Sequence, residues 1–168
     1  EATFSGASKF IGVGLHTWKT GSVTTMRGTF QRAGSMNANV SSWDVSKVKT
    51  MGAMFNHAET FEGTGLDKWI TSSLDDLYKT FDKAYLMNAN LGGWVVDSVT
   101  ALRYTFESTR RFRGAGLEKW NIGRVTSMVR TFMDARDMNA DLSGWKVSKV
   151  VTLEQTFRSA SKFTGAGL

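Results

Sequence analysis

Apolar residues recur along this chain with a period of 25 or 26 residues. Every repeat contains one tryptophan, and we number the other positions by their distance from it. Position +5 is Val or Leu, position +8 is Met or Leu, and position +12 is Phe, with mostly polar residues between them. A strict period of this length indicates units that bury their apolar faces only by stacking on one another. We therefore interpret these aromatic residues as a structural core ladder: Trp18, Trp43, Trp69, Trp94, Trp120, Trp145, Phe30, Phe55, Phe81, Phe106, Phe132 and Phe157.

Successive repeats alternate between two kinds of turn. Phe-x-Gly-x-Gly-Leu occupies 10–15, 61–66, 112–117 and 163–168, whereas Met-Asn-Ala occupies 36–38, 87–89 and 138–140. The sequence unit is therefore a pair of coils totalling 51 residues. We expect residues 1–168 to form a single solenoid array of about 6.5 coils. Because both ends fall inside a repeat, we also expect the array to be a segment of a longer protein.

Two local patterns alternate within each coil. Val48, Met51, Phe55 and Ala58 have the spacing of an amphipathic helix, and Ser46 before them is a suitable N-cap. The short apolar stretch 66–70, flanked by glycines, favours a brief strand. The sequence therefore predicts an α/β fold, a leucine-rich-repeat-like solenoid with one short strand and one helix per coil. The strands would form a parallel ladder on one face.

The charge of the chain suggests its kind of partner. The chain has 21 Lys and Arg against 15 Asp and Glu, a net charge of +6. This balance favours a protein with an acidic surface or an anionic glycan, and nucleic acid is not expected. No apolar run approaches the ~18 residues of a membrane span. The candidate partner-binding patch is basic and coincides with a break in the repeat pattern at Thr109, which replaces alanine: Arg103, Arg110, Arg111, Arg113 and Arg136.

The sequence offers little catalytic chemistry. The only histidines, His16 and His57, stand at different repeat positions, and cysteine is absent. The glycine motif recurs four times before a strand-like segment, whereas a phosphate-binding loop opens a helix, so we interpret its glycines as turn residues. We expect no enzymatic activity, no metal site and no cofactor.

A row of threonines suggests one minor alternative. Position +11 holds threonine in five of the six coils. A regular threonine row on a flat face could order water and bind ice. On a helix, however, the same hydroxyls could bond backbone carbonyls. The row consists of Thr29, Thr80, Thr105, Thr131 and Thr156.

The stretches SWDVSKVKTMGAMFNHAETF at 42–61 and SGWKVSKVVTLEQTFRSASKF at 143–163 resemble a known repeat. The repeat is that of BspA-like leucine-rich-repeat surface proteins and of related mycoplasma lipoproteins. This resemblance implies an extracellular or cell-surface location and a role in adhesion or interaction without enzymatic activity. The coil at Trp69 departs from the pattern, because WITSS replaces the W-D-V-S stretch and Asp75-Asp76 follows it.

Two function classes follow. The first is a non-enzymatic surface or extracellular module that presents a repeat scaffold for adhesion or for protein or glycan binding. The second is a structural scaffold or accessory subunit that docks an acidic partner in a larger assembly. Self-association is open in either class.

Overall fold

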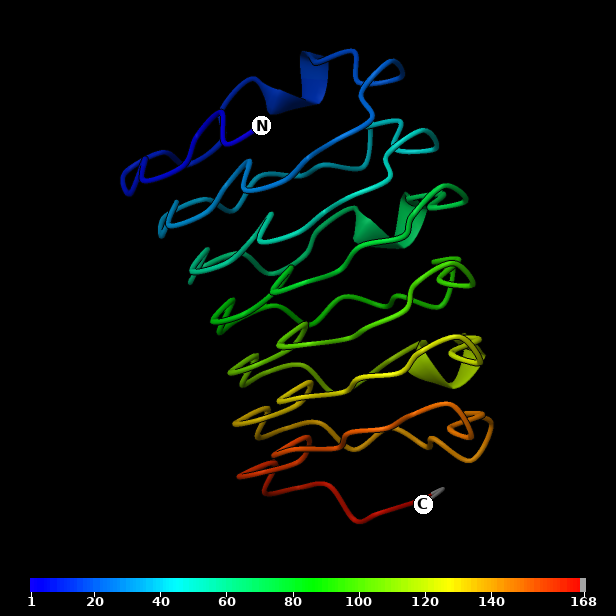
Figure 1. The fold of residues 1–168 in the computed structure, drawn as a ribbon. Helices are drawn as coiled ribbons and strands as arrows, with labels where there is room; N and C mark the ends of the chain where they lie inside the picture. Colours follow the sequence, from blue (N-terminus) through cyan, green and yellow to red (C-terminus); the bar gives the residue numbers. More distant parts are fainter. Residues whose placement is uncertain (167–168) are drawn as a thin grey trace.

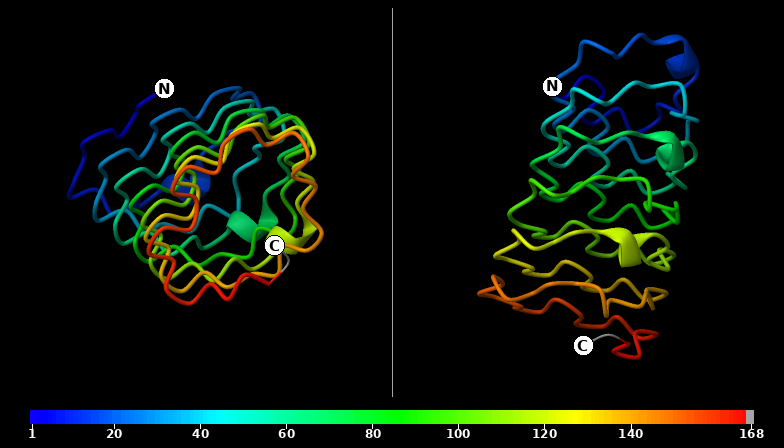
Figure 2. Two further views of the ribbon diagram at one scale, coloured as in Figure 1. Left: turned by 60° about the horizontal axis from the view of Figure 1, so that its bottom comes forward. Right: turned by 90° about the vertical axis from the view of Figure 1, so that its right-hand side faces the viewer.

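The computed structural model describes residues 1–166, and the chain winds through them as a stack of similar coils (Figure 1). The two termini lie at opposite ends of the stack. Viewed obliquely along the stack, the coils enclose one common interior (Figure 2). The regular elements of the described residues are three short 3-10 helices, η1 (Leu15–Thr17), η2 (Leu66–Lys68) and η3 (Leu117–Lys119). No helix in this part of the chain has the length and apolarity needed to cross a bilayer.

Along positions +8 to +14, backbone N–H groups of each coil donate to carbonyls of the next coil. Met26, Gly28 and Phe30 donate their N–H groups to the carbonyls of Thr50, Gly52 and Met54, each at 2.9 Å. The residues between them close turns within their own coil, as when Thr29 donates to Met26 at 3.2 Å. In this part of the coil, alternate N–H groups therefore point towards the C-terminal end of the stack, and alternate carbonyls point towards the N-terminal end. Outside it the direction reverses, as when Lys49 donates to the Thr24 carbonyl of the preceding coil at 2.9 Å. This arrangement satisfies the backbone without a helix or a strand.

The α/β fold class predicted from the sequence is wrong. Ala53 and His57, inside the predicted helix, have φ of 54° and 58°. An α-helix of L-residues requires negative φ throughout, so the segment 48–58 cannot be one. The His57 N–H donates instead to Asp82 of the next coil at 2.8 Å. The left-handed residues recur at positions +10 and +14 of the coils.

The predicted strand ladder is also wrong. In the segment 66–70, residues 66–68 form η2, and Trp69 after it is extended, with ψ of 135°. Residue pairing between coils is limited to isolated parallel bridges in the described residues, such as Thr25 with Thr50 and Thr50 with Asp76. The periodic apolar residues do form one core, but consecutive turns with inter-coil hydrogen bonds produce the same apolar spacing as a helix.

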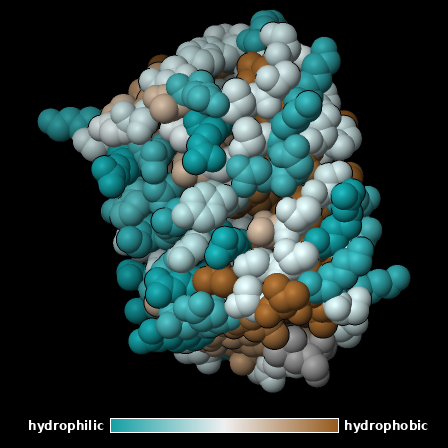
Figure 3. Space-filling model, in the orientation of Figure 1, coloured by the Kyte–Doolittle hydropathy of each residue, from teal (hydrophilic) through white to brown (hydrophobic). Residues whose placement is uncertain are grey.

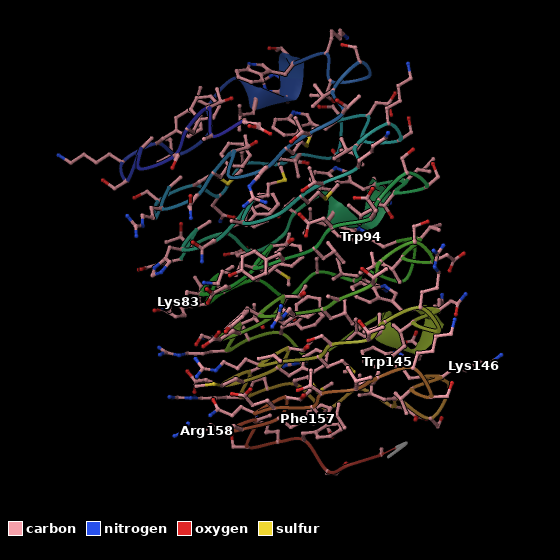
Figure 4. The ribbon with its side chains drawn as sticks, in the orientation of Figure 1. Lys83, Trp94, Trp145, Lys146, Phe157 and Arg158 are labelled. Carbon is pink, nitrogen blue, oxygen red and sulfur yellow. The ribbon has the colours of Figure 1, made fainter. Side chains whose placement is uncertain are left out.

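The aromatic ladder lies in the interior. The rings at position +12 stack from coil to coil, with centroids 5.6 Å apart for Phe81 and Phe106 and 5.5 Å for Phe106 and Phe132. Five tryptophans are buried, while Trp18 in the first coil is 42% exposed and Phe157 in the last coil is partly buried. Figure 4 shows Trp94, Trp145 and Phe157 between the two edges of the stack.

The indole N–H groups add a second row of bonds between coils. Trp94 Nε1 donates to the Leu66 carbonyl at 2.9 Å, and Trp145 Nε1 donates to the Leu117 carbonyl at 2.8 Å. A buried indole N–H needs such a partner, so each of the five buried tryptophans both fills the core and is bonded to the coil before it.

The threonine row is not available for ice. Thr80, Thr105 and Thr131 are fully buried, and Thr29 and Thr156 nearly so. Their hydroxyls donate to main-chain carbonyls, for example Thr131 to Leu102 of the preceding coil at 2.8 Å. The minor hypothesis of ice binding through this row is therefore wrong.

Candidate partner-binding edge

Four of the five sequence-predicted arginines lie along one edge of the stack. Arg110 and Arg136 occupy position +16 of adjacent coils, and Asp134 lies between them. Asp134 accepts from Arg136 Nε at 2.9 Å and from Arg110 Nε at 3.3 Å. Partial burial works to raise the pKa of Asp134, but the bonds from Arg136 and Arg110 outweigh it and lower the pKa. The carboxylate thus stays ionised and holds the two guanidinium groups together.

Arg111 and Arg113 lie in the same coil as Arg110 and face a second carboxylate. Asp137 pairs with Lys162 Nζ at 2.6 Å. This bond, with the charges of Arg113 and Arg111, lowers the Asp137 pKa. We call the whole set the arginine edge, which comprises Tyr85, Arg110, Arg111, Arg113, Asp134, Arg136, Asp137 and Lys162.

Tyr85 extends the arginine edge towards the N-terminal end. The Arg110 guanidinium lies over its ring, 4.4 Å from the centroid. Tyr85 also stands at position +16, one coil before Arg110. An arginine that stacks on an aromatic ring is held in one orientation while its other N–H groups stay available, so this contact preorganises the edge.

Arg103 is separate from the other four arginines. It stands at position +9, and no hydrogen bond or ion pair of the described residues joins its side chain to the arginine edge. Its neighbour Tyr104 belongs to a second, partly buried group. Lys79 lies 4.9 Å from the Tyr104 ring and 5.4 Å from the Tyr78 ring, and Arg130 lies 5.8 Å from Tyr104. The structure therefore divides the predicted basic patch between two places.

A buried polar row runs beneath this second group at position +13. Gln31 donates to Asn56 at 3.1 Å, and Asn56 donates to an Asp82 carboxylate oxygen at 2.9 Å. Asp82 is only 5% exposed, and burial, with the charge of Glu107, raises its pKa to about 6. Burial also raises the pKa of Glu107, while Arg130 opposes the shift. In this row, burial within the stack therefore shifts the pKa values of two carboxyl groups, Asp82 and Glu107.

Two hollows occupy equivalent places in successive 51-residue modules. The larger, about 720 Å³, lies between the turns 62–65 and 88–90 and is bordered by Arg111. The smaller, about 440 Å³, lies between the turns 11–14 and 38–42.

In the part of the chain that the structure describes, no three His, Cys, Asp or Glu side chains gather as ligands for a metal. His57 lies 3.9 Å from Glu59, and no described contact joins it to His16.

Sequence reasoning missed several members of the site. Asp134, Asp137 and Lys162 stand 24 to 52 residues from Arg110, and only the stacking brings them to the same edge. The three tyrosines of the chain, Tyr78, Tyr85 and Tyr104, all occupy positions +9, +10 or +16, outside the core columns. This restriction is present in the sequence, and it could have identified positions +9, +10 and +16 as positions outside the core.

Figure 3 shows hydrophilic residues gathered along the lower left side of the stack, and Figure 4 shows Lys83 and Arg158 projecting there. Lys146 projects from the opposite edge. Basic side chains are therefore present on both edges, but the interleaved arginine, tyrosine and aspartate contacts belong to the arginine edge.

A protein family described as "Mycoplasma protein of unknown function, DUF285" matches residues 1–116 and, in a second overlapping match, residues 76–167. Two overlapping matches agree with the internal repetition, and with the mycoplasma-type repeat that the sequence resembles. They do not identify the BspA-like leucine-rich repeat. Neither the curated proteins nor the solved structures compared with the chain include a match. Since the first match alone spans more than half of the chain, the protein belongs to this repeat-containing Mycoplasma family.

Proposed function

We propose that this protein is a non-enzymatic interaction module that binds an anionic partner, an acidic protein surface or an anionic glycan, through its arginine edge. The observation that carries the proposal is the local charge excess. Four arginines and Lys162 share the edge with only two carboxylates, Asp134 and Asp137. The arginines are exposed, with 45% of the Arg110 side chain and 57% of the Arg136 side chain accessible.

The geometry supports recognition of carboxylate or sulfate groups. Asp134 engages the Nε of Arg110 and Arg136, and the terminal N–H groups of these two side chains make no hydrogen bond among the described residues. A guanidinium group can bind two oxygens of a carboxylate or of a tetrahedral oxyanion at once, and these groups are held here by a carboxylate and a ring. The arginines of two adjacent coils, with Lys162 of the next coil, therefore present a spaced row of donors on the stack without a large ordering cost.

A binding titration with two probes tests the proposal. Heparin represents anionic glycans, and a poly-glutamate peptide represents acidic protein surfaces. We expect Arg111→Ala combined with Arg113→Ala to weaken binding of the preferred probe at least tenfold, and affinity to fall steeply between 50 and 500 mM salt because exposed charges are screened. Lys146→Ala combined with Lys149→Ala, on another part of the stack, is the matched control. An unchanged affinity in the arginine variant, or a flat salt response, would overturn the proposal.

An extracellular or cell-surface location is part of the same proposal. It is supported by the resemblance of 42–61 and 143–163 to the repeats of bacterial surface proteins. Antibody labelling of intact cells tests it, with permeabilised cells as the reference. Labelling confined to permeabilised cells would instead favour the alternative, an accessory subunit that docks an acidic partner in a larger assembly.

A further inference from the structure

The larger hollow, between the turns 62–65 and 88–90, lies in the middle of the described stack. The coil before it supports the first turn through Asn37, whose Oδ1 accepts an N–H of that turn at 3.0 Å. The coil after it donates the Arg113 N–H to the second turn at 3.1 Å. Both neighbouring coils are therefore in place around the hollow. Its volume, about 720 Å³, lies within the ~300–1,000 Å³ of small-molecule sites.

The lining of this hollow combines apolar, amide and charged groups. Leu86 is 37% exposed, and Arg111 stands at the same repeat position, +17, one coil later. Asn88 and Asn90 line the hollow with amide groups whose Nδ2 donates no hydrogen bond among the described residues. Glu62 adds an exposed carboxylate that forms no ion pair in the same part of the chain. Donors, acceptors and a small apolar surface therefore meet in one place.

The equivalent hollow of the first module shows which of these groups the repeat itself supplies. Ile11 and Val13 stand there at the positions of Glu62 and Thr64, 51 residues earlier. The lining of that smaller hollow includes neither an arginine nor a carboxylate. Stacking of the turns therefore forms a hollow in both modules, whereas residues particular to the second module give it charged groups.

We infer that the larger hollow binds one sugar ring of an anionic glycan whose other anionic groups lie along the arginine edge, an inference that rests on the proposed function. The apolar C–H face of the ring packs on Leu86. Its hydroxyls donate to the Glu62 carboxylate and accept from the amide of Asn90. A carboxylate or sulfate on the ring binds Arg111, which belongs to both the hollow and the arginine edge.

The carboxylates of the lining favour a glycan over an acidic protein surface. An ionised Asp or Glu side chain of a partner is only an acceptor, so it is repelled by Glu62. A sugar has hydroxyl donors beside its anionic group and can satisfy the same carboxylate. The second carboxylate of the lining, Asp67, is already paired with Lys68 at 3.0 Å. Glu62 therefore discriminates between the two anionic partners.

A substitution that fills the hollow tests the inference. Thr64 is exposed in the lining, so Thr64→Trp should obstruct the hollow without altering an arginine. We expect it to weaken binding of a heparin tetrasaccharide at least tenfold in isothermal titration calorimetry. Val13→Trp, at the same repeat position of the first module, is the matched control and should leave the affinity unchanged. Thermal melting verifies that both variants fold. Tetrasaccharide binding to Thr64→Trp with wild-type affinity would overturn the inference.

Glu62→Ala tests the hydroxyl contact through the sign of its effect. It removes a negative charge near the arginine edge, so electrostatics alone would strengthen the binding of any polyanion. Loss of the acceptor should instead weaken tetrasaccharide binding at least threefold and should not weaken poly-glutamate binding. Glu59→Ala removes the same charge from position +16, outside the hollow, and should weaken neither. Stronger tetrasaccharide binding by Glu62→Ala would contradict a sugar in the hollow.

Arg110→Gln combined with Arg136→Gln separates this inference from the proposed function, because neither arginine lines the hollow. Wild-type affinity of this variant for the tetrasaccharide would overturn the proposed function and the inference together. At least tenfold weaker binding, with Thr64→Trp and Glu62→Ala both unaffected, would keep the arginine edge as the binding site and overturn the inference alone. We expect all three variants to bind the tetrasaccharide more weakly than the wild type.

Discussion

The interior of the stack and the arginine edge follow opposite rules. At position +12 every coil has phenylalanine, and Phe81, Phe106 and Phe132 are fully buried. At position +16, four residues further along, no chemical type persists. The six coils carry Gly34, Glu59, Tyr85, Arg110, Arg136 and Ser161 there. A buried ring must fit the rings above and below it, whereas an outward side chain meets only solvent or a partner.

This difference distinguishes repeat positions whose residue type is the same in every coil from repeat positions whose residue type varies. The interior determines that coils stack, and it does so with nearly the same residues each time. The edge determines what the stack contacts, and its identity comes from residues that differ between coils. Substitutions in the interior should therefore change stability, and substitutions at the edge should change binding with little effect on stability.

Phe106→Ala should have the largest effect on stability. The Phe106 ring is fully buried and stacks on Phe81, Phe112 and Phe132, at 5.6, 4.6 and 5.5 Å. Its removal leaves a cavity in the middle of the ladder and should cost about 3–5 kcal/mol in the free energy of unfolding. Phe157→Ala, in the partly buried last coil, is the matched control and should cost less. Chemical denaturation measures both, and equal losses would contradict a continuous core.

Gly116→Ala should have the next largest effect. A Cβ at Gly116 would lie 2.0 Å from the backbone nitrogen of Gly92, and its φ of 93° disfavours alanine. Overpacking and backbone strain together should cost about 2–4 kcal/mol. Gly14 stands at the same repeat position with φ of 85°, but a Cβ there meets nothing within 4 Å. Gly14→Ala should therefore cost only the strain, about 1 kcal/mol. If the two variants melt at the same temperature, close stacking of the turns is not the cause.

Asp82→Asn should produce a smaller, pH-dependent effect. Burial and then Glu107 raise the Asp82 pKa to about 6 in the folded state, against 3.8 for an ordinary aspartate. The folded state therefore binds the proton more tightly, and stability falls as the pH rises from about 4 through 6. Allowing for partial solvent screening, the loss should be about 2 kcal/mol. Asp82→Asn removes this loss, so its unfolding free energy at pH 7 should exceed that of the wild type.

The same experiment has an internal check at lower pH. The pKa of Asp134 is lowered by its bonds to Arg136 and Arg110, against the opposing effect of burial. Its contribution is therefore present above about pH 4 and lost below it. The wild type and Asp82→Asn should converge near pH 4 and then lose stability together. A constant difference at every pH would show that Asp82 acts through packing rather than through its charge.

The sequence predicted the periodic core but not the local backbone. The columns of Trp and Phe determine which residues stack, because only a repeated structure buries them together. The left-handed residues are hidden, however. At positions +10 and +14 the chain has Lys79, Tyr104, Arg130 and Lys83, residues that normally avoid positive φ. Among the six coils that begin at a tryptophan, Gly28 is the one glycine at these positions, so the spacing still predicted a helix.

The candidate site was predicted in part for a related reason. Arg110, Arg111 and Arg113 are adjacent in sequence, so their clustering could be recognised from the chain alone. Asp134 joins Arg110 to Arg136 across a distance of one coil, which depends on the register of the stack. Arg103 likewise lies apart from the arginine edge because the chain turns between position +9, where Arg103 stands, and position +16, where Arg110 and Arg136 stand. Sequence proximity therefore identified the patch, and only the folded coils showed its limits.

Arg110→Gln combined with Arg136→Gln should have the smallest effect on stability. Both side chains are largely exposed, and exposed ion pairs contribute about 0–1 kcal/mol. We expect the unfolding free energy to change by less than about 1 kcal/mol, while heparin or poly-glutamate binding weakens at least tenfold. Thermal melting and binding titrations of the same preparation measure the two quantities. A large loss of stability with binding intact would reverse the comparison, because the edge would then belong to the scaffold and the partner would bind elsewhere on the coils.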